Sequence, residues 1–94
     1  MNTTRLLARD LDPMPRAMRS LISAEHPNSD LRNASIYSLP LMFCGVDWQE
    51  RSVELWDACQ EKMPEHRVVS AQVVEGTQSG SYVVVKTVFL GAVS

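Results

Sequence analysis

The sequence predicts a small α+β domain, in which an N-terminal helical segment (residues 1–33) precedes a βαββ core (residues 34–94). Three observations lead to this fold class. Apolar residues recur at helical spacing in two stretches, and a nearly unbroken run of branched apolar residues lies close to the C-terminus. A five-residue segment from Gly76 to Gly80 separates that run from an earlier one, which is typical of a hairpin loop. A chain of 94 residues suits one domain with one modest core.

The N-terminal segment is divided by Pro13 and Pro15. Before the prolines, three leucines are compatible with one or two helical turns: Leu6, Leu7 and Leu11. After them, apolar residues recur at helical spacing, and they are Met14, Met18, Leu21 and Ile22. Pro15 suits the first turn of this helix, because its missing N–H would be unpaired there in any case.

The first core strand is expected at residues 34–44. Pro40 cannot donate to a ladder, so it places this strand at a sheet edge or marks a kink in it. The strands from His66 to Glu75 and from Ser81 to about Leu90 complete a three-stranded, mainly antiparallel sheet.

A helix is expected from Asp47 to about Met63, because Asp47 and Glu50 have the spacing of a capping box and Pro64 follows as a stop. Its apolar side chains project to one side: Trp48, Val53, Leu55, Trp56, Cys59 and Met63. We expect this side to cover the sheet, with Trp56 as the central residue of the core.

The register of the hairpin decides which residues share a face of the sheet. If Glu75 pairs with Ser81, three further pairs follow: Val73 with Val83, Ala71 with Val85, and Val69 with Thr87. The opposite face then carries four apolar side chains that need a cover: Tyr82, Val84, Val88 and Leu90. The cover is the helix after Pro15, a second copy of the protein, or a different partner. These four residues are the predicted protein interface, and the unpaired edges of a three-stranded sheet favour a homodimer.

Composition restricts the kinds of partner. The net charge of −2 argues against a grip on nucleic acid or anionic lipid by the domain as a whole. The chain has no apolar run typical of a signal peptide or a membrane span, so we expect a cytoplasmic protein without membrane contact. Two charged groups remain as possible partner-binding surfaces. They are the arginines Arg5, Arg9, Arg16 and Arg19, and the acidic residues Glu50, Glu54, Asp57 and Glu61.

Residue types that carry chemistry are few. His26, His66, Cys44 and Cys59 show no spacing typical of a structural zinc site. Cys59 falls on the apolar side of its helix, where a cysteine usually behaves as a small hydrophobe. We therefore predict no catalytic residue, no metal and no cofactor.

Three short stretches carry a resemblance that covers residues 41–91. They are LMFCG, ACQEKMP, and the S-x-G-x-Y-x-V rhythm around Ser79 to Val84. In these stretches the chain resembles the small bacterial YbeD-like domains, which have a ferredoxin-like, ACT-domain-like βαββ plan. The resemblance implies a ferredoxin-like half and a regulatory or binding role, and it implies no functional residue. The family continues with a second helix and a fourth strand, whereas the additional helix of this chain lies at the N-terminus.

The sequence thus favours a non-catalytic binding or regulatory module that acts through protein–protein contacts as a homodimer. By analogy only, small inhibitors of host machinery from phages and mobile elements have this size and the same lack of motifs. The alternative is a nucleic-acid-binding accessory protein that uses the N-terminal arginines.

Overall fold

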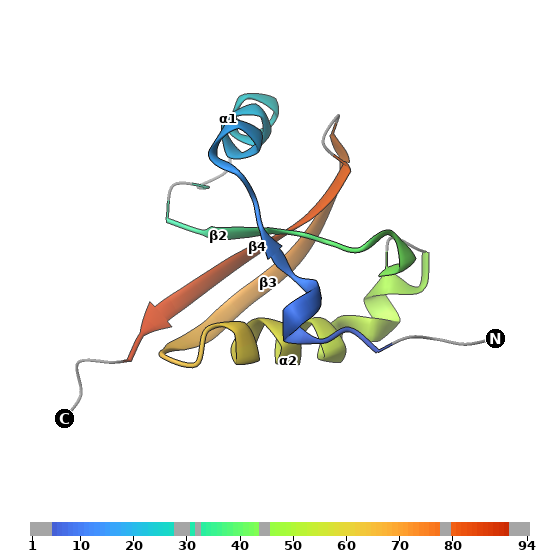
Figure 1. The fold of residues 1–94 in the computed structure, drawn as a ribbon, viewed down its shortest axis with the longest axis vertical. Coiled ribbons are helices and arrows are strands. Elements are labelled where there is room, and N and C mark those ends of the chain that lie inside the picture. The colour runs from blue at the N-terminus through green and yellow to red at the C-terminus, as the bar shows by residue number, and fades with distance from the viewer. Residues whose placement is uncertain (1–4, 28–30, 32, 44–45, 78–79, 91–94) are drawn as a thin grey trace.

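The computed structural model describes residues 5–27, 31, 33–43, 46–77 and 80–90. Within these ranges the chain forms a four-stranded antiparallel sheet in the order β1-β2-β4-β3, with helix α1 on one side and α2 on the other (Figure 1). The elements are β1 (Asp12–Pro13), α1 (Arg16–Glu25), β2 (Ser35–Ser38), α2 (Ser52–Lys62), β3 (His66–Thr77) and β4 (Gly80–Phe89). The α+β class is confirmed.

Two parts of the predicted fold are wrong, because the sheet has four strands rather than three and the helices do not follow the predicted order along the chain. A two-residue strand, β1, precedes α1 and pairs with β2, so the described part of the N-terminal segment is not helical throughout. β2 therefore lies inside the sheet and not at its edge. Pro40 does not disturb a ladder, because β2 ends at Ser38 and Pro40 accepts a hydrogen bond from the Phe43 N–H (2.9 Å) in the turn that follows.

The helix of the core begins later than predicted. Residues 46–51 form a 3₁₀ helix, η3 (Val46–Arg51), and α2 starts at Ser52, so the spacing of Asp47 and Glu50 does not mark its first turn. The end of α2 is as expected, with Lys62 as its last residue and Pro64 beyond the cap. Two more 3₁₀ helices are present, η1 (Ala8–Asp10) and η2 (Leu41–Phe43).

The register of β3 and β4 agrees with the prediction near the loop and departs from it further away. Val73 pairs with Val83 and Ala71 with Val85, as predicted. The register then shifts between Val68 and Ser70, so that Val68 and not Val69 lies opposite Thr87. Val69 is the extra residue of this β-bulge. The strands also extend further into the hairpin than expected, to a pair of Thr77 with Gly80, whose φ of +92° is the left-handed conformation that glycine adopts without strain.

Alternate residues of β4 point into two separate cores, one on each face of the sheet. On the α2 side, Val83 and Val85 pack with Leu55 and Cys59, and on the α1 side Tyr82 and Val84 pack with Ile22. The segment before β1 adds Leu6 and Leu11 to the α2 side. This arrangement explains why the strand run has hardly any polar break: both of its faces are covered by the same chain.

Candidate protein-interaction surface

The predicted interface divides into a buried and an exposed half. Tyr82 and Val84 are buried beneath α1, among Met14, Ile22 and neighbouring apolar residues. The helix of the same chain is thus the cover for these two side chains. Val88 and Leu90 lie beyond the reach of that core and are exposed, by 52% and 47% of their surface.

Two residues that the sequence assigned to the core join Val88 and Leu90 at the surface. Trp56 of α2 is 40% exposed and Val69 of β3 is 50% exposed. Together with Arg67 and Val68, these four residues line one open groove of about 440 Å³. We call the four exposed side chains, Trp56, Val69, Val88 and Leu90, the apolar patch.

The bulge and the rotation of α2 explain why Trp56 and Val69 were missed. Strict alternation places Val69 under α2, but the extra residue at the bulge gives that position to Val68, which is buried. In α2 the buried side chains are Leu55, Ala58 and Cys59. Trp56 therefore stands at the flank of the helix, and its predicted place as the central core residue is wrong.

The flank of α2 that carries Trp56 runs along the outer edge of β3. Gln60, one turn after Trp56, fixes the two elements together. Its Nε2 donates to His66 O (2.6 Å) and to Met63 O (3.3 Å), and its Oε1 accepts from the Val68 N–H (3.1 Å). One side-chain amide thus satisfies backbone groups at the start of an edge strand, where another strand would otherwise pair.

The acidic residues do not form one free surface. Glu54 accepts hydrogen bonds from the Leu6 N–H (3.2 Å) and from Arg51 (2.9 Å). The Leu6 N–H first, and then Arg51, lower the pKa of Glu54, so its carboxylate serves to attach the N-terminal segment to α2. Glu50, Asp57 and Glu61 are exposed.

The four arginines also fail to form one surface. Arg9 belongs to η1, which packs against α2, and the charge of Arg5 acts on Glu54 of the same helix. Arg16 and Arg19 lie on α1, on the opposite side of the sheet (Figure 1).

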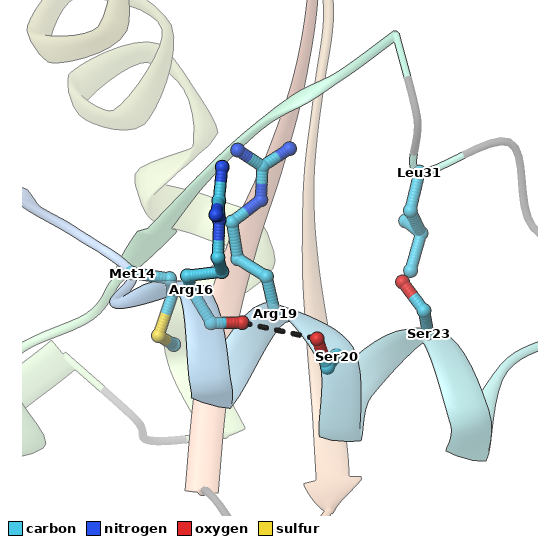
Figure 2. Close-up of a pocket in the computed structure, with 6 residues that line it drawn as sticks. All are labelled: Met14, Arg16, Arg19, Ser20, Ser23 and Leu31. Atoms are coloured by element: carbon cyan, nitrogen blue, oxygen red, sulfur yellow. Dashed lines mark hydrogen bonds between the residues drawn. The ribbon is translucent and has the colours of Figure 1, made fainter.

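Arg16 and Arg19 line an open pocket of about 580 Å³ together with Met14, Ser20, Ser23 and Leu31, and Figure 2 shows both guanidinium groups on the same side of α1. Arg19 donates to the backbone carbonyl of Ala34 at 3.1 Å. At least one of the two arginines is therefore engaged in joining α1 to the start of β2.

The reactive side chains that the structure describes, those of Cys59, His66 and His26, each pack against other residues of the fold. Burial raises the pKa of the Cys59 thiol to about 11, so the thiol is protonated at neutral pH and is not a nucleophile. The His66 ring lies 3.1 Å from the Thr87 hydroxyl and packs against Phe89, and His26 packs against Tyr82. Among the residues that the structure describes, no cluster of His, Cys, Asp and Glu has the arrangement of a metal site. Cys44 lies outside the described residues.

In the described ranges no helix combines the length and apolar character needed to cross a membrane. We compared the chain with protein-family models, with curated proteins and with solved structures, and none of the three comparisons found a match.

Proposed function

We propose that this protein is a small non-catalytic binding module that acts through protein–protein contacts and associates as a homodimer through the apolar patch. The observation that carries the proposal is the convergence of Trp56, Val69, Val88 and Leu90 on one groove. Exposed apolar side chains that cluster in this way usually mark an interaction site, whereas scattered ones need no explanation.

The composition of the patch supports a protein partner. Tryptophan and arginine are both enriched among the residues that dominate the binding energy of protein interfaces. Trp56 and Arg67 line the same groove. A second copy is the partner we favour, because symmetric dimers are the commonest closed assemblies. The nucleic-acid alternative has less support, since Arg5 and Arg9 lie across the sheet from Arg16 and Arg19.

The order of the strands agrees with the ferredoxin-like plan that the resemblance to YbeD-like domains implies. β2 and β3 are connected through α2, and β4 lies between them, antiparallel to both. This is the split βαβ arrangement of a ferredoxin-like half. Small domains of that plan serve as binding modules in the family, and an equivalent role in protein contacts is part of the proposal.

Substitution of Val88 by lysine tests the proposal. Val88→Lys places a charge in the patch without touching either core, so we expect it to separate the dimer, to leave helix content unchanged, and to leave the thermal midpoint unchanged at low concentration, where the wild type is a monomer. Leu21→Lys is the matched control, because Leu21 is similarly exposed (48%) on α1, away from the patch. Light scattering after size exclusion and circular dichroism measure the two properties. If both variants have the same mass as the wild type, the patch is not the site of association.

A further inference from the structure

The outer edge of β3 is closed at one end and open in its middle. β3 is the last strand in the sheet order, so no described strand pairs with its outer side. Gln60 occupies this edge at His66 and Val68 and does not reach beyond the bulge at Val69. The edge that an incoming strand can use therefore starts after Val69.

The sheet hydrogen bonds decide which backbone groups point outward there. The Met14 N–H donates to Ile36 O (3.0 Å), so Ile36 directs its backbone groups toward the β1 side. In an antiparallel ladder the direction alternates, so Ser35 and Tyr37 bond to β4, at Val85 and Val83.

The same alternation continues from β4 to β3. The N–H and C=O groups of Val83 and Val85 point toward β2. The residues opposite them on β3, Val73 and Ala71, therefore point their own N–H and C=O groups toward the outer edge of the sheet. Gln72 lies between them and bonds inward, to Val84.

We infer that the β3 edge pairs with the same edge of a second copy in antiparallel orientation, centred on Gln72, so that Ala71 of each chain exchanges hydrogen bonds with Val73 of the other. This inference rests on the proposed homodimer and adds the strand that forms it. Pairing centred on Gln72 uses both outward-facing residues and stays clear of the bulge and of Gln60. The two sheets then form one continuous sheet.

The charges of β3 suit this pairing. Arg67 stands near one end of the strand and Glu75 near the other, and residues 68–74 between them carry no charge. Antiparallel alignment brings the Arg67 end of each strand beside the Glu75 end of its partner, whereas parallel alignment brings like charges together. The strand is thus complementary to itself in one direction only.

The flank of α2 supplies apolar surface for the same contact. A two-fold axis perpendicular to the sheet keeps both copies of α2 on one face, next to each other. Val53 and Trp56 are exposed and lie two turns and one turn before Gln60, respectively, on the flank that Gln60 joins to the β3 edge. A second groove, of about 310 Å³, runs between Ser52 of this flank and Ala71 to Val73 of β3. A partner strand and its helix would cover both grooves.

Amide hydrogen exchange of the wild-type protein tests the inference, read by NMR at low and high protein concentration. We expect the amides of Ala71 and Val73 to exchange fast when dilute and to become protected when concentrated. The inward amides of Gln72 and Val74 serve as internal controls, because their bonds to β4 protect them at both concentrations.

The possible outcomes separate the inference from the proposed function. Concentration-dependent protection of Ala71 and Val73 supports strand pairing. A dimer in which these two amides remain unprotected overturns strand pairing and leaves association through the apolar patch. A monomer at every concentration overturns both.

Ala71→Pro provides a second test, because it removes an outward N–H while leaving the inward bonds of β3 in place, and proline is tolerated at such edge positions. We expect Ala71→Pro to raise the dissociation constant of the dimer about tenfold or more. Ala71→Ser keeps the N–H, so we expect it to dimerise as the wild type does. Circular dichroism confirms that each variant is folded, and a folded Ala71→Pro that dimerises normally contradicts the inference.

Discussion

Among single residues, Gln60 makes the most specific contribution to the fold. Its side-chain amide donates hydrogen bonds to Met63 O and His66 O and accepts one from the Val68 N–H. These hydrogen bonds link the end of α2 to the start of β3. We expect Gln60→Ala to lower the free energy of unfolding by about 1–3 kcal/mol, because it leaves these backbone groups without a partner. Urea denaturation measures the loss. A Gln60→Glu variant keeps the acceptor for Val68 but sets a carboxylate oxygen against the carbonyls of Met63 and His66, so it should be no more stable than Gln60→Ala at neutral pH. An unchanged midpoint in Gln60→Ala would show that water replaces the amide.

Trp56 is expected to matter more for association than for stability. A fully buried tryptophan costs about 3–5 kcal/mol when replaced by alanine. Trp56 is partly exposed at the rim of a groove, so we expect Trp56→Ala to cost less than about 2 kcal/mol of folding stability and to weaken self-association by about tenfold or more. Denaturation at a low concentration and sedimentation at a high one measure the two effects separately. A large loss of stability with intact association would contradict the assignment.

Cys59 makes stability depend on pH in the alkaline range. Burial raises the pKa of its thiol to about 11, above the value near 8.5 of an unfolded chain. The native state therefore favours the protonated thiol, and this contribution is complete below about pH 8.5 and is lost as the pH rises through 11. We expect it to amount to about 3 kcal/mol. Denaturation series between neutral and alkaline pH should show a steeper decline for the wild type than for Cys59→Ala, and parallel curves would contradict the buried thiol.

At the scale of elements, α1 is the cover of the sheet face that Tyr82 and Val84 form. We expect Val84→Lys to destabilise the folded chain by several kcal/mol, about 3 or more, because it places an unpaired charge beneath α1. Limited proteolysis should then cut within residues 16–25 before the rest of the domain. If Val84→Lys instead keeps the wild-type denaturation midpoint, α1 is not the cover in solution.

The elements also show what a sequence pattern can and cannot predict. Periodicity located α1, the end of α2, both long strands and the register around Ala71 and Val73, because a repeating apolar side must be buried along its whole length. It could not locate β1, since two residues have no period. It also misplaced Val69 and Trp56, because one extra residue at a bulge reverses the alternation of a strand. Half of the candidate site, Val88 and Leu90, was predictable, and the other half depends on that bulge and on the rotation of α2.

At the scale of the whole molecule, one sheet separates two cores, and each face is covered by elements of the same chain. The N-terminal segment contributes to both, because Leu6 and Leu11 pack on the α2 side while Met14 packs on the α1 side. Both faces are covered, whereas the β3 edge and the adjoining apolar patch combine exposed apolar side chains with a strand that has no described neighbour on its outer side. The central claim is therefore that this surface, and not a face of the sheet, joins two copies of the protein.

Sedimentation equilibrium of the wild-type protein over a concentration series tests this claim most directly. The account predicts a reversible exchange between monomer and dimer, with the dimer predominant at high micromolar concentration and with no larger species, since two-fold pairing of β3 uses up the edge. Val88→Lys, measured in the same way, should remain a monomer over that range. A wild-type chain that sediments as a monomer at high micromolar concentration, or one whose mass continues to grow beyond the dimer, would contradict the account.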